Sequence, residues 1–224
     1  MNYDFIIYGS GISGKITAIA LAKRSFKVCL INDNLKDLNK QETNLVTFLS
    51  TGSLNYLSTV LPQHQIFSQY EEIKEIKCQL NSLDGKRQQL ISFDDESNQC
   101  LGKIVKNSTF DNILTDILKA NKNIDIRDNS ADISIENTLD GINLNLDNGD
   151  TLKSKLFILS SSKNKSVLNS IKINFVQKDF LQHALSVVVK GKLKNNNCAF
   201  QYFTHDGPLA VLPYLENEAS IVWS

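Results

Sequence analysis

Three glycines near the start of the chain are spaced for binding a phosphate group. Gly9, Gly11 and Gly14 stand in the pattern G-S-G-I-S-G, directly after a short apolar run. In such a loop the first glycine permits a tight turn, the second admits a pyrophosphate, and the third allows close helix packing. Amides at the start of the helix then hold the anion, and Ser13 could add a hydroxyl donor. This glycine loop, residues 9–14, predicts a dinucleotide site, with a glycine-rich turn in an unrelated α/β protein as the alternative.

A dinucleotide site of this kind also needs a partner for the ribose at the end of the second strand. The sequence places Asn32 and Asp33 there. Asn32 can bond hydroxyl groups, but a neutral amide forms weaker hydrogen bonds than a carboxylate. Asp33 takes this role if the strand ends one residue later, and otherwise it is an ordinary turn residue.

Other kinds of chemistry find little support in the residues. The three histidines lie in polar or turn-like segments, and no serine or cysteine has a partner that the sequence can assign, so no catalytic residue is predicted. The cysteines are scattered without metal-ligand spacing: Cys29, Cys78, Cys100 and Cys198. We expect no metal site and reduced thiols in a cytoplasmic protein. The 24 basic and 24 acidic side chains balance, which argues against nucleic acid as a partner.

The elements that position the glycine loop are a strand, a helix and a second strand. Residues 3–8 form a buried, β-prone run, and residues 27–31 form another. Between them Ile12, Ile16 and Ile19 recur at helical spacing while Lys15 falls elsewhere, which predicts an amphipathic helix to about residue 24. Two short strands joined by a helix indicate a parallel pair with a right-handed crossover.

Two patterns alternate along the rest of the chain. Helical spacing at 110–118 and a buried run at 156–159 continue the α/β pattern, whereas residues 73–93 alternate with period two around a turn at Asp84-Gly85. Residues 32–51 are interpreted as a polar loop. We therefore expect an α/β nucleotide-binding domain of residues 1–63 and 98–171. An inserted, mainly antiparallel β-sheet domain takes residues 64–97 and 172–224.

Nothing in the sequence indicates a membrane span or a signal peptide. The longest apolar runs are about half a dozen residues, against the roughly 20 that a spanning helix needs. The chain starts without a basic segment followed by an apolar one.

Four segments together resemble the class A FAD-dependent monooxygenases, and within them the ubiquinone-biosynthesis hydroxylases. Residues 4–14 resemble the FAD-binding start of the larger family, and residues 101–107 resemble the group's L-G-Y-I-V-E-N segment. Residues 202–213 resemble its R-F-T-x-x-G-P-L-A-L-L-P strand pair, and residues 220–224 the S-L-V-W-T that follows. The order and spacing of the four agree, so the resemblance covers the whole chain.

The resemblance implies a fold, a reaction and a set of partners. The fold is α/β, with a Rossmann-like FAD-binding domain and an interleaved, mainly antiparallel β-sheet substrate domain. The reaction is hydroxylation of a polyprenylated phenol in ubiquinone biosynthesis, with FAD as cofactor, NAD(P)H as electron donor and O2 as co-substrate. The cofactor supplies the hard chemistry, so no protein nucleophile is required. The resemblance also implies transient contact with a membrane surface or a biosynthetic complex, and a location peripheral to the inner face of the membrane.

The resemblance also carries over particular residues. By position, Pro208, Leu209, Val211 and Pro213 would line the substrate pocket, and Ser162 would stand in a second FAD fingerprint.

The sequence departs from the family pattern in four places. Asn32 stands where the family usually has Glu, Ser162 replaces an Asp, residues 43–45 lack an expected Arg, and a G-D-A-A-H segment is absent before residue 224. We therefore expect the 224-residue chain alone to be inactive. Two alternatives stay open: a non-catalytic relative that serves as an accessory or structural subunit, and another two-domain FAD oxidoreductase.

Overall fold

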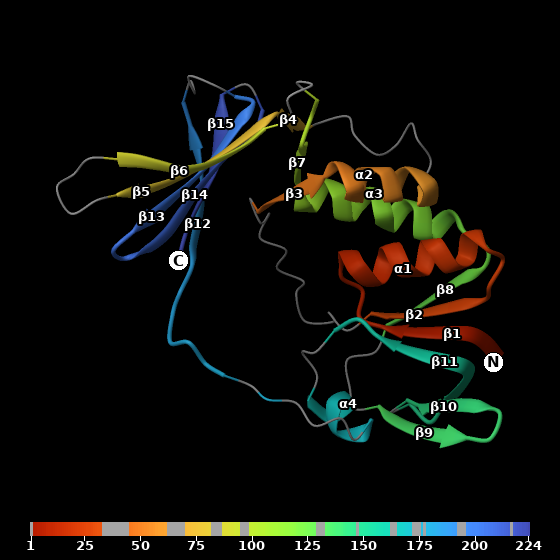
Figure 1. Ribbon diagram of the computed structural model, residues 1–224. Helices are drawn as coiled ribbons and strands as arrows, with labels where there is room; N and C mark the ends of the chain where they lie inside the picture. The colour runs from red at the N-terminus through yellow and green to blue at the C-terminus, as the bar shows by residue number, and fades with distance from the viewer. Residues whose placement is uncertain are drawn as a thin grey trace. The chain divides into compact units, whose positions relative to one another are not determined.

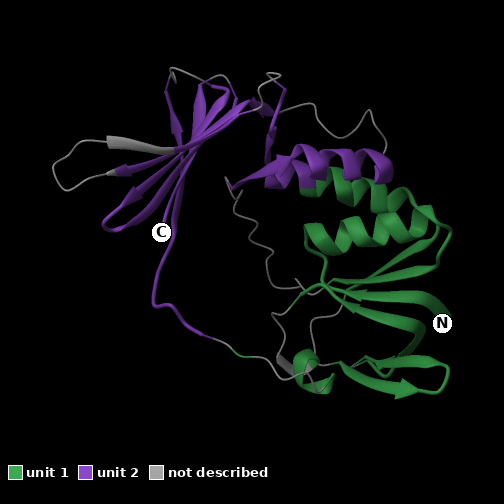
Figure 2. Ribbon diagram, viewed as in Figure 1, with its two compact units in different colours: residues 1–41, 111–177 green, residues 42–110, 178–224 purple. Residues whose placement is uncertain are grey.

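The chain forms two compact units, each built from segments that are distant in the sequence. The computed structural model describes residues 2–32, 45–61, 70–81, 87–94, 99–128, 133–146, 148–161, 165–171, 176, 178–191, 196–215 and 217–224. Unit 1 comprises residues 1–41 and 111–177, and unit 2 comprises residues 42–110 and 178–224 (Figure 2). The domain limits expected from the sequence differ over residues 42–63 and 98–110, which are grouped with unit 2 here, and over residues 172–177, which are grouped with unit 1.

Unit 1 is organised around a six-stranded sheet in the order β8-β2-β1-β11-β10-β9 (Figure 1). The strands are β1 (Asn2–Tyr8), β2 (Val28–Asn32), β8 (Ile124–Asp128), β9 (Ser134–Thr138), β10 (Gly141–Asn145) and β11 (Thr151–Leu159). The first four in spatial order run parallel, and β10 and β9 add an antiparallel edge. The parallel β1–β2 pair confirms the sequence-based prediction, and two hairpins turn at Gly141 and Gly149.

The two central parallel strands of this sheet, β1 and β2, contain runs of consecutive buried apolar residues, as expected for strands covered on both faces. Ile6, Ile7 and Tyr8 of β1 and all of β2 except Asn32 are buried. One cluster joins these strands to the antiparallel edge: Tyr3, Ile6, Tyr8, Cys29, Ile31, Ile133, Leu144, Leu152 and Val167. The carboxyl ends of the four parallel strands therefore sit on a rigid base.

Helix α1 (Ile12–Lys23) confirms the expected helix but buries a different face. Its buried residues are Gly14, Lys15, Ala18, Ile19 and Ala22. The expectation that Lys15 lies on a solvated face is wrong. Its ammonium group lies 2.6 Å from Asp111 Oδ1 and donates to Thr115 Oγ1 at 2.8 Å, both on α3 (Asn107–Ala120). Of the three isoleucines that were expected to form the buried face, only Ile19 is buried. Small residues and the paired Lys15 make up the rest of the face that packs closely.

Unit 2 contains a second six-stranded sheet in the order β12-β15-β14-β13-β5-β6. Its strands are β5 (Glu75–Asn81), β6 (Arg87–Asp94), β12 (Leu185–Lys190), β13 (Cys198–Thr204), β14 (Gly207–Pro213) and β15 (Glu218–Trp223). All neighbours are antiparallel except β5 and β13, which run parallel. The expected, mainly antiparallel sheet domain is thus present.

A three-stranded sheet and a helix complete unit 2. The strands are β3 (Val46–Ser50), β7 (Gly102–Lys106) and β4 (Glu71–Ile73), in the order β3-β7-β4, and α2 spans Thr51–Val60. The interpretation of residues 32–51 as a polar loop is therefore wrong at its end, because β3 pairs along its whole length with β7. Ile73, Ile104, Ala199 and Tyr214 form the core between the two sheets of this unit.

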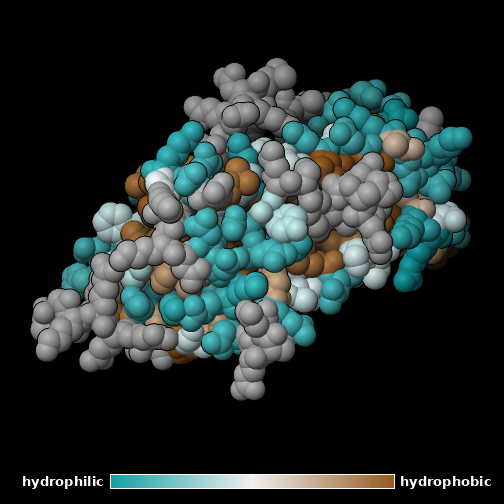
Figure 3. All heavy atoms as spheres, turned by 90° about the horizontal axis from the view of Figure 1, so that it is seen from above, coloured by the Kyte–Doolittle hydropathy of each residue, from teal (hydrophilic) through white to brown (hydrophobic). Residues whose placement is uncertain are grey.

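The face seen in Figure 3 carries mostly hydrophilic side chains, with separate hydrophobic patches between them. In the described part of the chain, no helix combines the length and apolar character that crossing a membrane requires.

Candidate dinucleotide site

The glycine loop lies at the carboxyl ends of the parallel strands of unit 1, between β1 and α1. Gly9 has φ +111°, which favours glycine, and a Cβ there would stand 2.6 Å from the Cβ of Ser161. A Cβ on Gly14 would collide with the carbonyl oxygen of Gly9. The loop is thus packed tightly against itself and against the segment that follows β11, so these two glycines are required by the protein.

Gly11 differs from its two neighbours because nothing in the protein requires a glycine there. It is the N-cap of α1 with φ −65° and ψ 173°, a conformation open to any residue, and a Cβ would meet no atom of the described residues within 4 Å. Among the described residues no side chain caps this helix. A side chain at Gly11 would therefore occupy space that the described residues leave open beside the start of α1, at the positive end of the helix dipole. The cradle has the form that a pyrophosphate needs.

Asn32, the last residue of β2, is tied to the glycine loop and to the neighbouring strand. Its Oδ1 accepts a hydrogen bond from Ser10 Oγ at 2.5 Å, and its Nδ2 donates to Asp128 Oδ1 at 2.9 Å. The structure thus brings Asn32 beside the loop as the sequence predicted. Ser13 lies in the first turn of α1 and is exposed. Asp33 and Ser162 lie outside the described residues, so their expected roles stay predictions.

Asp128, which sequence reasoning missed, stands at the same edge. It is the last residue of β8 and pairs in register with Asn32. The only sequence signal is an acid at the end of a short strand, and nothing along the chain shows that this strand neighbours β2.

The four expected substrate-pocket residues lie in unit 2 on β14, but not all on one face. Side chains alternate along a strand, so Leu209, Val211 and Pro213 share a face while Pro208 points to the other. Across the sheet Val211 is paired with Phe200 and Ile221, and Leu209 with Tyr202 and Trp223. The structure therefore brings three of the four residues onto one apolar, aromatic-rich face.

The largest pKa shifts in unit 1 lie within the sheet rather than in the loop. Burial raises the pKa of Tyr3 to about 12, and its hydroxyl donates to Asp125 Oδ2 at 2.8 Å. Burial likewise raises the pKa of the Cys29 thiol to about 12. These groups stay neutral at ordinary pH, so they stabilise the sheet and offer no nucleophile.

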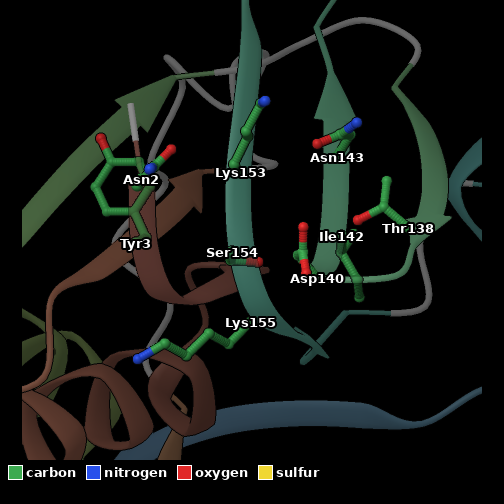
Figure 4. Close-up of a pocket in the computed structure, with 9 residues that line it drawn as sticks. All are labelled: Asn2, Tyr3, Thr138, Asp140, Ile142, Asn143, Lys153, Ser154 and Lys155. Atoms are coloured by element: carbon green, nitrogen blue, oxygen red, sulfur yellow. The ribbon is translucent and has the colours of Figure 1, made fainter.

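A separate hollow of about 450 Å³ opens at the amino ends of β1 and β11 (Figure 4). Asn2, Lys153 and Lys155 line it, together with Asp140 from the β9–β10 turn. Lys155 is already paired with Asp4 at 2.7 Å. Because the glycine loop is at the opposite ends of these strands, this hollow is not part of the dinucleotide site.

The fold is that of the FAD-dependent monooxygenases. A probable FAD-dependent monooxygenase from Pseudomonas aeruginosa, PqsL, superposes with a TM-score of 0.76 at 12% sequence identity, covering 99% of this chain and 60% of that one. The p-nitrophenol 4-monooxygenase PnpA of Pseudomonas putida gives a TM-score of 0.75 at 13% identity, covering 99% and 57%.

Sequence comparison narrows the relationship to the ubiquinone-biosynthesis group. The mitochondrial ubiquinone biosynthesis monooxygenase COQ6 of Rattus norvegicus is 26% identical over 244 residues, covering 99% of this chain and 50% of that protein. The 3-demethoxyubiquinol 3-hydroxylase of Escherichia coli is 23% identical over 229 residues, covering 98% and 56%. No protein-family model matches the chain. The resemblance to ubiquinone-biosynthesis flavin hydroxylases is thus confirmed, and the chain spans about half the length of these curated relatives.

Proposed function

We propose that this protein is an FAD-dependent aromatic hydroxylase of ubiquinone biosynthesis. The observation that carries the proposal is the open space at Gly11. None of the described residues requires a glycine there, whereas a bound pyrophosphate would need the space that a side chain would fill. The names of the curated relatives supply the reaction class and the pathway. The expected substrate is a polyprenylated phenol, with NAD(P)H as electron donor and O2 as co-substrate.

Each part of the proposed site has a physical role. The amides at the start of α1 bind the FAD pyrophosphate, and the tight packing of Gly9 and Gly14 keeps them in place. Bound FAD supplies the redox and oxygen chemistry. Leu209 and Val211 present an apolar surface that excludes water and accepts a phenol with a prenyl chain.

A second candidate is a dinucleotide-binding subunit without catalytic activity. Asn32 favours this alternative, because a neutral amide stands where the resemblance implies a carboxylate. The hydroxylase would act in contact with a membrane surface or a biosynthetic complex, because its expected substrate is lipid-like. A location in the cytoplasm, peripheral to the membrane, stays part of the proposal.

The test combines a binding measurement with a labelling measurement. The purified protein is titrated with FAD, and bound flavin is followed by absorbance near roughly 450 nm. The labelling measurement uses the protein extended to the length of the curated relatives, because the 224-residue chain alone is expected to be inactive. This protein is supplied with FAD, NADH or NADPH, isotopically labelled O2 and a polyprenylated phenol, and the mass of the product is measured by mass spectrometry. FAD binding with one labelled oxygen in the product supports the hydroxylase. FAD binding without labelled product supports the second candidate, and absence of FAD binding contradicts both.

A further inference from the structure

We infer that the carboxylate of Asp128, held in place by Asn32, accepts the ribose hydroxyls of the adenosine half of the bound dinucleotide. This inference rests on the proposed function, since it concerns the same site. It assigns to the end of β8 a role that the resemblance would place at the end of β2.

The first argument is position. Asn32 and Asp128 are the last residues of two adjacent parallel strands and pair in register, so their side chains meet at one edge of the sheet. The glycine loop begins at this edge, and the amide of Gly9 donates to the carbonyl oxygen of Ile31 at 3.0 Å. In parallel α/β sheets a nucleotide binds beyond the carboxyl ends of the strands. Asp128 therefore lies where the adenosine must pass.

The second argument is the number of hydrogen-bond acceptor positions that Asn32 and Asp128 still have for a ligand. A ribose hydroxyl that donates a proton needs an acceptor, and one of the two lone pairs of Asn32 Oδ1 is already taken by the hydrogen bond from Ser10 Oγ at 2.5 Å, so Asn32 alone cannot accept from both hydroxyls of a diol. The Nδ2 group of Asn32 donates to Asp128 Oδ1. A carboxylate has two oxygens and about four lone-pair positions, so this one bond leaves Asp128 acceptor capacity for a diol. Its side chain is exposed and can reach a ligand.

The third argument is charge compatibility between the two positions. A glutamate at position 32 would place a second carboxylate beside Asp128, and two like charges at hydrogen-bond distance repel each other. An amide at 32 instead donates to the acid and orients it. The amide at the end of β2 and the acid at the end of β8 therefore act together: Asn32 positions the carboxylate of Asp128, and Asp128 binds the ribose hydroxyls.

The test compares two ligands that differ only in the ribose hydroxyls. Wild-type protein and the variant Asp128→Asn are titrated calorimetrically with ADP and with 2′,3′-dideoxy-ADP. The new amide can still accept from Asn32, so the local geometry is kept while the charge is lost. We expect ADP affinity to fall about tenfold and dideoxy-ADP affinity to change less than about twofold. Asp150→Asn is the matched control. It removes the same charge from an exposed residue just before β11, at the amino-terminal ends of the parallel strands and so away from the glycine loop. We expect both affinities to stay unchanged.

A second pair of variants moves the carboxylate from one strand to the other. Asn32→Glu alone should weaken ADP binding, because it sets two carboxylates against each other. Asn32→Glu combined with Asp128→Asn should restore binding to within about threefold of wild type and restore the preference for ADP over dideoxy-ADP. Tighter ADP binding by Asn32→Glu alone would overturn the inference.

Different negative results would contradict either the inference about Asp128 or the proposed function. If wild-type protein binds FAD and ADP but Asp128→Asn binds ADP equally well, the inference is overturned and the proposed function stands. Equal losses for ADP and dideoxy-ADP also overturn it, because Asp128 would then act elsewhere than on the ribose. If wild-type protein binds neither FAD nor ADP, the proposed function itself fails, and the inference with it.

Discussion

Gly11 and Gly14 are three residues apart, yet they are glycines for opposite reasons. Gly14 is enclosed by the protein, because a Cβ would collide with the carbonyl oxygen of Gly9. Gly11 is surrounded by open space and has an ordinary backbone conformation. We propose that Gly14 serves the fold and Gly11 serves a ligand, and a pair of substitutions can separate the two roles.

Replacing Gly11 with valine should abolish cofactor binding and leave the fold intact. The branched side chain would occupy the space of the pyrophosphate, so we expect FAD affinity to fall by about 100-fold or more, with little change in the unfolding midpoint. Gly14→Ala is the contrasting variant. Its added methyl group has no space, and we expect a loss of roughly 1–3 kcal/mol in the free energy of unfolding. Flavin titration and urea unfolding measure the two effects, and unchanged flavin binding by Gly11→Val would remove the loop from the site.

The two halves of the candidate site differed in how well the sequence could predict them. The glycine loop is contiguous and stands between a strand and a helix, so its place in the fold could be predicted locally, while its role as a dinucleotide site stays a prediction. The bond between Asn32 and Asp128 joins strands separated by all of residues 33–127, and strand order is not encoded in either segment. The expectation about Pro208 shows the same limit, because motif resemblance does not state which face of a strand a residue occupies.

At the scale of elements, α1 is held against α3 by a buried ion pair. The Lys15 side chain is 11% exposed and that of Asp111 is 25% exposed, with 2.6 Å between Nζ and Oδ1. Such a pair contributes little in net terms, but removal of one partner leaves a charge without its neutralising group. The two ends of the pair should therefore tolerate substitution differently.

Asp111→Ala should destabilise unit 1 more than Lys15→Met. The first variant leaves a largely buried ammonium group, for which we expect a loss of about 2–3 kcal/mol in the free energy of unfolding. The second replaces the lysine with an apolar side chain of similar length and should cost about 1 kcal/mol or less. Urea unfolding followed by circular dichroism gives both numbers. Equal losses would show that packing, rather than the unpaired charge, governs this contact.

The elements that could be predicted are those whose signals are local. The first β-α-β unit, the period of α3 and the turns at Gly141 and Gly149 follow from spacing within a few residues. β3 was missed because its residues are only half-buried and it gains its stability from pairing with β7. The parallel pairing of β5 with β13 was missed for the same reason, since the two strands are distant in sequence.

At the scale of the whole molecule, stability should fall at alkaline pH. Tyr3 and Cys29 are buried in the sheet of unit 1, and burial raises the pKa of each to about 12 from ordinary values of 10.0 and 9.0. The unfolded chain therefore loses these protons at lower pH than the folded chain does. The stabilisation is complete below about pH 9 and is lost as the pH rises toward 12.

The variant Tyr3→Phe should flatten this alkaline loss. Phenylalanine cannot ionise, so the free energy of unfolding should decline less between pH 9 and 12 than in wild type, with the contribution of Cys29 remaining. Tyr56→Phe is the matched control, because Tyr56 lies on α2 in unit 2 and is 54% exposed. Urea midpoints at several pH values measure the slope, and identical slopes for wild type and Tyr3→Phe would contradict the role of this buried hydroxyl.

The pairing of β1 with β11 has a consequence for how the protein is made. Asn2 lies opposite Lys153, and the glycine loop rests against Ser160 and Ser161. A nascent chain that has emerged from the ribosome only as far as β10 holds the whole glycine loop but not the strand that supports it. Contacts this far apart in sequence form slowly, and domains begin to fold during synthesis. The segments of unit 2 between residues 42 and 110 are therefore translated before the glycine loop gains the support of β11, so the proposed cofactor can be captured only after β11 has emerged.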